Sequence, residues 1–412
     1  MRKVRLSKLH WHVEQAKNGE VTLRLNEVFI YSKYRPKEDA VRWIDAEFDE
    51  EAESYLLIGL GLGYHLRELI GKSKDKPVTV YYFDKNEYEL FLNYNRDLWW
   101  KKECVQIVHD LTQTELHGNV QILLPNVWVK GIGENHPLFL TLEVIKINQL
   151  SYKKNAEKLE DNFFRNKALK DESIKKQKQD KVACLVAAGP SLNDTVSWLK
   201  EYQYKVDIYV VGAALKKLLA NGIVPKATIL SDANDGTLSQ FQNTHFKGDM
   251  YYLSTANYNS VAAHKGKRYI LYQQGYKLAE KEAEKRNAPL VETGGSVGTT
   301  TFSLLENLGY EIVVLFGQDL GFVGVQTHAT LSTSGRDASN DVFVRKIEAN
   351  DDSYIHTTAI FQTFWYWYEQ KMETTKVKVF NTATKGAKIR NTPLISEEKF
   401  KELIVRNEKG VL

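Results

Sequence analysis

Short apolar runs alternate with stretches of helical spacing over most of the chain. The early apolar runs are at residues 55–60, 78–83, 105–108 and 120–123. Helical stretches at residues 65–70 and 87–98 separate the first three of these runs. Strands that alternate with helices indicate an α/β fold with a largely parallel sheet. We expect residues 1–140 to form one Rossmann-like, doubly wound unit.

Residues 141–181 have a different pattern. Leu142, Ile145 and Leu150 recur at helical spacing, the segment ends in a run of charged residues, and it contains no glycine or proline. This pattern predicts a long helix or a helix pair. We therefore interpret the segment as a helical linker.

Strand-like runs resume after the linker, with helical stretches between several of them. They are at residues 182–187, 208–211, 227–230, 250–253, 269–272 and 312–316. Residues 182–330 are expected to form a second Rossmann-like, doubly wound α/β unit. Residues 331–412 are expected to complete it as a mixed, partly helical region.

Two patterns stand out near the C-terminal end of the chain. Residues 323–352 are polar and contain glycine, which is typical of a mobile loop. Residues 359–373 read as an aromatic helix that buries one face. The residues expected on that face are Phe361, Phe364, Trp365 and Tyr368, with Trp367 to one side.

Composition narrows the class of protein. Of 412 residues, 43% are apolar and 26% charged, as in soluble globular proteins, and a net charge of +4 does not suggest a nucleic-acid binder. Cys104 and Cys184 are too few for a disulfide framework or a metal site. The N-terminal segment lacks a secretory signal, and no run is long enough to span a membrane. We expect a cytoplasmic protein.

The first glycine-rich loop, Gly59-x-Gly61-x-Gly63, follows a strand and precedes a helix, and Asp84 ends the next strand. Such a loop can bring a dinucleotide or S-adenosylmethionine close to a helix N-terminus. The alternative is a tight turn that needs glycine only for packing, and we favour that structural interpretation.

The second loop is Gly189-Pro190-Ser191-Leu192, which runs directly from a strand into a helix. Gly189 gives access to the backbone, Pro190 fixes the turn, and Ser191 can cap the helix or donate to a phosphate. A plain capped turn is the alternative. Further on, Gly212 follows the next strand.

Asp232 lies at the end of the strand run at residues 227–230, where an acid would face the ligand crevice of such a sheet or cap a helix. Gly294, Gly295 and Ser296 begin a helix and could cradle an anion.

Gln318 and Asp319 follow the strand run at residues 312–316, and His328 comes nine residues after Asp319. A lone histidine is often structural, but this one follows a strand end. We therefore treat His328 as a candidate for the site.

The motifs GPSL, SDA, GGSVGTT, GQDLGF and THA, in this order, resemble the MptE-like domain of the motility-associated factor (Maf) glycosyltransferases. They are more distantly similar to bacterial sialyltransferases. The resemblance covers about residues 182–395, and the region of Gly59–Gly63 is similar to the Maf N-terminal domain.

This resemblance implies transfer of a nonulosonic acid, of the pseudaminic or legionaminic type, from its CMP-sugar to Ser or Thr of flagellin. No metal and no further cofactor are expected. The turn at Gly189–Leu192 would hold CMP, and Ser296 would stabilise charge on the leaving phosphate. His328 would be the general base, with Asp232 and Asp319 as carboxylate alternatives.

The sugar's carboxylate calls for a basic partner. The candidates are Arg336, Arg345, Lys385 and Lys388. Two other functions stay open: a pterin diphosphokinase, and a non-catalytic, nucleotide-binding flagellin chaperone.

Overall fold

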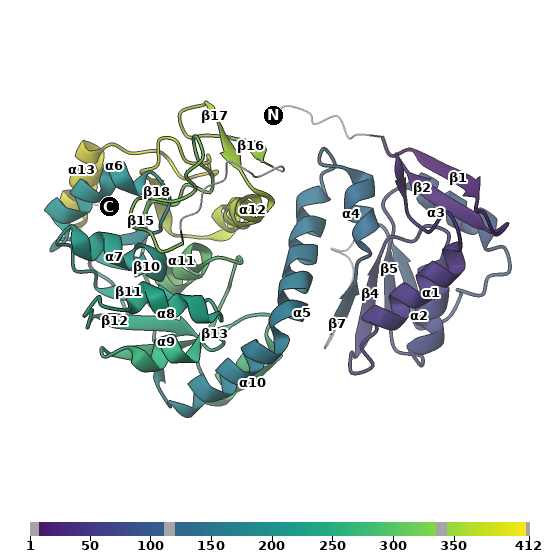
Figure 1. Cartoon of the computed structure of the whole chain (residues 1–412), viewed down its shortest axis with the longest axis horizontal. Helices are drawn as coiled ribbons and strands as arrows, with labels where there is room; N and C mark the ends of the chain where they lie inside the picture. Colours follow the sequence, from purple (N-terminus) through teal and green to yellow (C-terminus); the bar gives the residue numbers. More distant parts are fainter. Residues whose placement is uncertain (1–7, 111–119, 335–343, 409–412) are drawn as a thin grey trace. The chain divides into compact units, whose positions relative to one another are not determined.

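The computed structural model describes residues 8–110, 120–334 and 344–408. The chain divides into two compact units, Met1–Gln149 and Leu150–Leu412 (Figure 1). The boundary falls inside α5 (Phe139–Ala168), a single helix of 30 residues where we expected a helical linker. Among the described helices, none has both the length and the apolar character needed to cross a membrane.

The N-terminal unit contains a parallel four-stranded sheet with the order β6-β5-β4-β7. Its α/β alternation matches the prediction, but the small antiparallel sheet that precedes it was not foreseen. The antiparallel strands are β1 (Trp11–Gln15), β2 (Val21–Leu25) and β3 (Val28–Phe29). The parallel strands are β4 (Ser54–Ile58), β5 (Val78–Tyr81), β6 (Val105–Val108) and β7 (Val120–Leu123). The helices are α1 (Pro36–Glu47), α2 (Tyr64–Lys72), α3 (Lys85–Tyr94) and α4 (Asn126–Ile132).

The glycine loop after β4 is packed against the chain's own aromatic side chains. Gly59, Gly61 and Gly63 have φ values of +94°, +52° and +83°, which favour glycine. A side chain on Gly59 would lie 2.1 Å from the Trp128 ring, and one on Gly61 would lie 2.6 Å from the Tyr31 hydroxyl. The glycines are therefore required by internal packing.

The backbone N–H groups of this loop are also satisfied internally. Glu87 is fully buried, and its carboxyl group accepts hydrogen bonds from the N–H groups of Leu60 (2.7 Å), Gly61 (2.7 Å) and Phe83 (2.6 Å). These donors are the groups that would otherwise bind an anionic ligand. The carboxyl group of Glu87 thus occupies the position where an anionic ligand would otherwise bind.

Asp84, the acid expected to meet a ribose hydroxyl, is engaged as well. It caps α3 by accepting from the N–H of Glu87 (2.9 Å), and it accepts from the indole N–H of Trp11 (3.0 Å). These contacts agree with the structural interpretation of the Gly59–Gly63 loop.

The C-terminal unit is built on a nine-stranded sheet in which every paired strand is parallel. Its order is β14-β13-β12-β11-β10-β9-β15-β18, with β8 beside β13. The strands are β8 (Glu172–Ser173), β9 (Ala183–Val186), β10 (Asp207–Val211), β11 (Ala227–Leu230), β12 (Asp249–Leu253), β13 (Arg268–Gln273), β14 (Leu290–Val291), β15 (Ile312–Phe316) and β18 (Lys378–Asn381). The helices are α6 (Leu192–Tyr202), α7 (Gly212–Ala220), α8 (Leu238–Phe241), α9 (Tyr258–Ala263), α10 (Lys277–Arg286), α11 (Val297–Leu308), α12 (Ala359–Thr374) and α13 (Glu397–Glu408).

The strand order reverses direction at β9. Strands β10 to β13 extend to one side of β9, whereas β15 and β18 extend to the other. Because crossovers between parallel strands are right-handed, α6 and α11 lie on opposite faces of the sheet. Such a reversal opens a crevice at the carboxyl ends of the strands, where α/β proteins bind ligands.

One segment that we expected to be a loop contains regular structure. Strands β16 (Arg345–Glu348) and β17 (Tyr354–Thr357) form an antiparallel hairpin. Ile347, Ile355 and Thr357 are its buried side chains. Each strand has few apolar positions, so the alternation of apolar and polar residues that predicts a strand is hard to recognise in this polar segment.

The aromatic helix α12 buries Tyr368 as expected, whereas Trp365 and Trp367 are both half-buried and both pack against the core, so the expected contrast between the two tryptophans is not observed. Trp367 lies against Gly294, where an added Cβ would come within 2.4 Å of the indole ring. Trp365 borders a surface groove and donates its indole N–H to the Lys388 carbonyl (2.8 Å). A glycine on the facing loop lets Trp367 pack, and the helical pattern alone does not reveal this.

We predict that Glu87 makes the stability of the N-terminal unit depend on pH. Burial raises the pKa of Glu87 from 4.5 to about 8, so the folded state holds a proton that the unfolded chain releases. This contribution is fully present below pH 4.5 and is lost as pH rises through 8, by up to about 5 kcal/mol. Urea unfolding followed by tryptophan fluorescence between pH 7 and 9 measures it, because this range lies above the one in which buried His65, with its lowered pKa, changes stability in the opposite direction.

Glu87→Gln should flatten this decline, because an amide does not titrate. The matched control is Glu89→Gln on the exposed side of the same helix. An equally steep decline in Glu87→Gln would assign the pH dependence to other groups.

Candidate functional site

The two loops that follow β9 and β15 meet at the reversal of the strand order. The N–H of Gly189 donates to the carbonyl of Gly317 (2.8 Å). A Cβ on Gly189 would lie 2.2 Å from a carboxylate oxygen of Asp319 and 2.5 Å from the Gly317 carbonyl. Gly189 is therefore required for the close approach of the two loops.

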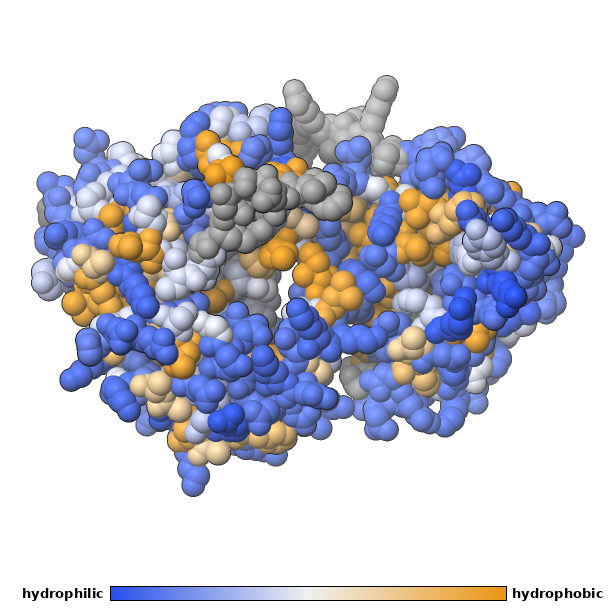
Figure 2. Space-filling view, in the orientation of Figure 1, coloured by the Kyte–Doolittle hydropathy of each residue, from blue (hydrophilic) through white to orange (hydrophobic). Residues whose placement is uncertain are grey.

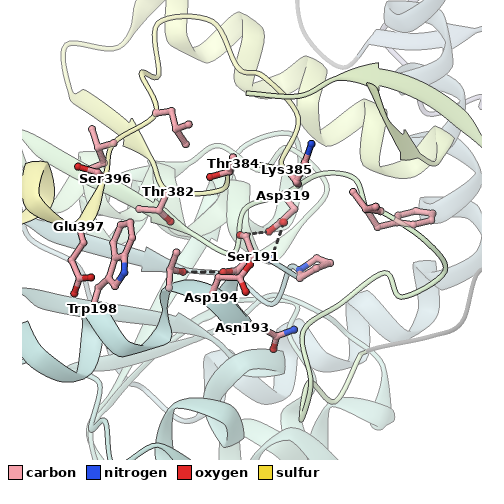
Figure 3. A pocket seen from close by; sticks show the side chains of 16 residues that line it. Ser191, Asn193, Asp194, Trp198, Asp319, Thr382, Thr384, Lys385, Ser396 and Glu397 are labelled. Carbon is pink, nitrogen blue, oxygen red and sulfur yellow. Dashed lines mark hydrogen bonds between the residues drawn. The ribbon is translucent and has the colours of Figure 1, made fainter. Parts of the chain in front are cut away.

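Asp319 is the central side chain of this meeting point. It is only 3% exposed, and it accepts hydrogen bonds from the backbone N–H (3.0 Å) and the hydroxyl (2.7 Å) of Ser191 (Figure 3). Burial raises the pKa of Asp319 to about 6, against the lowering effect of these two donors. Asp319 is consequently ionised at neutral pH but close enough to its pKa to exchange a proton.

Ser191 does not make the helix cap that we expected. It precedes α6, but its hydroxyl makes no hydrogen bond to the first turn of the helix. The proton of that hydroxyl is directed at Asp319 instead. The local sequence predicts a cap because Asp319, which binds the hydroxyl instead, lies 128 positions further along the chain.

A cavity of about 170 Å³ lies next to the start of α11, and we call it the α11 cavity. It brings together five of the residues predicted from the sequence. These are Gly189, Ser296, Gln318, Asp319 and His328. The convergence of four separate motifs on one cavity supports a ligand site there.

A second cavity, of about 660 Å³, lies beside α6 and the start of α13, and we call it the α6 cavity (Figure 3). Pro190, Ser191 and Asp319 line it, together with residues that follow β18. Asp319 lines both cavities. One titratable carboxylate thus lies between two separate spaces.

The α11 cavity is next to a well-formed helix start. Ser296 caps α11 by accepting from the N–H of Thr299 (3.1 Å) in a reciprocal capping box. The first N–H groups of a helix have no partner within it and attract anions. Gln318, which is 5% exposed, accepts from the Tyr368 hydroxyl at 3.5 Å.

His328 is held at the α11 cavity by several contacts. Its Nδ1 lies 2.8 Å from the Thr327 hydroxyl, and its ring lies edge-on to Phe361 at 6.0 Å. The N–H of the next residue, Ala329, donates to the carbonyl of Ala188 (2.8 Å). This stretch of the expected mobile loop is therefore attached to the turn after β9.

A polar cluster around the buried Lys217, not predicted from the sequence, fixes the same stretch. Asn193 Oδ1 accepts from the N–H (3.1 Å) and the hydroxyl (2.9 Å) of Thr330, and also from Lys217 Nζ (2.6 Å). Lys217 is 5% exposed, donates to the Thr330 hydroxyl (3.0 Å), and has its pKa lowered by burial. The one signal in the sequence was a lysine on the otherwise apolar face of α7.

Two of the predicted binding residues have structural positions. Leu192 is fully buried in the core. Gly212 begins α7, and a Cβ there would lie 2.2 Å from the Gln240 side chain. Neither residue lines the α11 cavity or the α6 cavity.

The glycine pair before α11 also serves packing. Gly294 lies against Trp367, and a Cβ on Gly295 would lie 3.1 Å from the Phe364 ring. Neither glycine lines the two cavities, although Ser296 does line the α11 cavity.

Asp232 follows β11 and lies apart from both cavities. Its carboxylate accepts from the backbone N–H and the side-chain amide of Asn234, both at 2.8 Å. It therefore stabilises its own turn, and the structure does not bring it to the cavities lined by Asp319.

The basic residues expected near a sugar carboxylate are spread over the C-terminal region. Arg336 lies outside the described residues. The other three are engaged with neighbours: Arg345 with Gln362, Lys385 with Asp351, and Lys388 with Glu348 and Asp352. Of these three, Lys385 lines the α6 cavity.

Together, the reversed parallel sheet, the glycine turn and the cavities at the strand ends define a doubly wound α/β domain with the architecture of a nucleotide-binding protein. Residues 153–325 match the family model described as 6-hydroxymethylpterin diphosphokinase MptE-like. The predicted resemblance to the MptE-like domain is confirmed over these residues, which contain β9 to β15 and the turns that follow β9 and β15.

The fold is similar to that of a Maf glycosyltransferase from Magnetospirillum magneticum AMB-1. The two chains are 14% identical with a TM-score of 0.51, and the match covers 99% of this chain and 75% of the other. The predicted α/β fold class is confirmed. No curated protein matches the sequence significantly.

We predict that Asn193→Ala releases the stretch that carries His328. The change removes the acceptor for Thr330 and one partner of Lys217, at a cost of roughly 0.5–1.5 kcal/mol, because both Asn193 and Thr330 are exposed and water can replace the lost contacts. Hydrogen exchange measured by mass spectrometry should show faster exchange of residues 327–333, with β15 unchanged. Thr330→Ser is the control, because it keeps the hydroxyl; equal protection in Asn193→Ala and wild type would contradict the role of the cluster.

Proposed function

We propose that this protein is a cytoplasmic glycosyltransferase that transfers a nonulosonic acid from its CMP-sugar to a Ser or Thr hydroxyl of flagellin. The observation that carries the proposal is the position of Asp319, a buried carboxylate shared by two cavities at the reversal of the sheet. Group transfer between two substrates needs such a meeting point. The similarity in fold to a Maf glycosyltransferase supports the same class of reaction.

The proposed reaction joins the acceptor oxygen to the anomeric carbon of the sugar and breaks the bond between that carbon and the CMP phosphate oxygen. The hydroxyl proton passes to a general base, and CMP leaves with the bonding electron pair. N–H groups at the start of α11 would stabilise the charge that develops on the phosphate.

Two side chains can accept the proton. His328 lines the α11 cavity, and Asp319 lines both cavities. Asp232 lines neither cavity, so we no longer include it as a candidate. With a pKa of about 6, Asp319 is mainly ionised at neutral pH and can act as a base.

A second function follows from the description of the matching family model, which names a pterin diphosphokinase. That reaction would use ATP and a hydroxymethyl pterin rather than a CMP-sugar. A flagellin chaperone that binds nucleotide without catalysis would use neither reaction.

We predict that CMP and CMP-sugars raise the melting temperature of the protein, whereas ATP with Mg²⁺ and a hydroxymethyl pterin do not. Ligand that binds only the folded state stabilises it by mass action. Thermal-shift measurement with each nucleotide decides between the functions. Stabilisation by ATP–Mg²⁺ with pterin alone would favour the kinase, and tight flagellin binding without any nucleotide response would favour the chaperone.

We predict that His328→Ala retains CMP binding but loses transfer by about 10²–10⁴-fold if His328 is the base. Asp319→Asn should damage transfer too, and it should remove the loss of rate that protonation of Asp319 causes below about pH 6. Intact-mass analysis of flagellin measures transfer, and calorimetry with CMP is the parallel control. Full glycosylation by His328→Ala would leave Asp319 as the base.

A further inference from the structure

The two cavities that share Asp319 differ in the charge of their walls. Among the described residues that line the α11 cavity, Asp319 is the sole carboxylate. The α6 cavity adds Asp194 and Glu397 to Asp319. Its one lysine, Lys385, already pairs with Asp351. The α6 cavity is therefore acidic.

Three buried hydroxyl groups of the α6 cavity strengthen this difference, because they donate their protons to acceptors inside the protein. Ser191 donates to Asp319 (2.7 Å), Thr195 donates to the Ser191 carbonyl (3.1 Å), and Thr382 donates to the Leu315 carbonyl (2.9 Å). All three residues are buried. Their oxygens can therefore offer only lone pairs to a ligand, so this part of the wall accepts hydrogen bonds.

An aromatic ring completes the wall. Trp198 is half-buried, and its ring lies against Phe316 (6.2 Å) and Phe400 (6.4 Å), which fix its orientation. In Figure 3, Trp198 and Glu397 lie at one side of the cavity, and Asp319 and Lys385 lie at the other. An indole ring beside a carboxylate attracts an ammonium or guanidinium group.

A phosphate or a sugar carboxylate fits this wall poorly. Both are anions that only accept hydrogen bonds, and here they would meet carboxylates and oxygens whose protons are directed elsewhere. A ligand rich in N–H and O–H groups, with positive or no net charge, is complementary to it. The α6 cavity would discriminate between ligands by repelling anions as much as by attracting cations.

We propose that the α6 cavity is the acceptor subsite and that it selects a Ser- or Thr-containing peptide with neighbouring basic residues. This inference rests on the proposed transfer to a protein hydroxyl. The anionic donor then occupies the α11 cavity. The acceptor hydroxyl reaches the boundary at Asp319, and a flanking basic side chain lies towards Trp198 and Glu397.

The test uses the full chain and two peptides with blocked ends, Lys-Ser-Thr-Ser-Lys and Glu-Ser-Thr-Ser-Glu. Calorimetry at low salt should show binding of the lysine peptide at least about tenfold tighter than of the glutamate peptide. The double variant Asp194→Asn/Glu397→Gln should lose most of this preference. Glu398→Gln, on the next residue of α13 and outside the cavity, is the matched control.

A second variant fills the α6 cavity with a large side chain. Thr384 is an exposed residue that lines the cavity, and Thr384→Trp should abolish peptide binding while CMP affinity stays within about twofold. Thr374→Trp at the end of α12 is the control for the added ring. Both variants are at exposed positions, and circular dichroism checks that they fold.

Each outcome decides a separate claim. Equal affinity for both peptides, no peptide binding by the wild-type protein, or peptide binding that survives Thr384→Trp would overturn the assignment. Loss of CMP binding in Thr384→Trp would place the donor in the α6 cavity and also overturn it. Failure of the wild-type protein to bind CMP would refute the proposed function, and the peptide results would still show whether the cavity selects basic peptides.

Discussion

The carboxylate of Asp319 holds the candidate site together. It comes from the loop after β15, and it accepts both the N–H and the hydroxyl proton of Ser191 from the turn after β9. These two contacts bring the loops so close that Gly189 has no room for a side chain. In these contacts the Ser191 hydroxyl donates its proton to Asp319, and burial raises the pKa of the Asp319 carboxyl group to about 6. Structure and reactivity of the site thus depend on one buried group, and it cannot be replaced without affecting both.

The N-terminal unit also has a buried carboxyl group beside a glycine loop, but the space around it is filled. There, Glu87 accepts three backbone N–H groups around the glycine loop after β4. Trp128 and Tyr31 fill the space beside the glycines, so the loop is closed by side chains of its own unit. In the C-terminal unit, the corresponding carboxylate has a cavity on each side. A buried carboxylate can therefore take the place of a ligand at one strand end and prepare a site at another, and the packing around it makes the difference.

The sequence predicted the parts of the fold that repeat over several residues. Apolar runs located β9, β10, β11 and β15 closely, and the turns after β9 and β15 were correctly placed at strand ends. It failed where a partner lies far away in the chain. The hydroxyl of Ser191 meets Asp319, Trp367 packs on Gly294, and Asn193 holds Thr330. None of these pairs leaves a periodic signal, because each depends on how separate loops meet in space. Glycine motifs show a similar limit: the same residue allows a ligand to approach or an internal side chain to pack, and only the structure separates the two.

The direction of the hydroxyl protons adds information that a list of polar residues does not contain. Ser191, Thr195 and Thr382 would suit either a phosphate or an ammonium group if their protons were free to turn. In this structure all three protons are donated to acceptors inside the protein. The oxygens that remain have the same hydrogen-bonding character as the carboxylates of Asp194 and Glu397, so this part of the wall favours donor groups. At the α11 cavity, a helix begins with N–H groups that favour acceptors. The α6 cavity also lies at helix starts, those of α6 and α13, but there Asp194 and Glu397 place negative charge in the first turns. The two spaces on either side of Asp319 therefore differ in the charge that they favour, as the proposed transfer between an anionic donor and a hydroxyl-bearing acceptor requires.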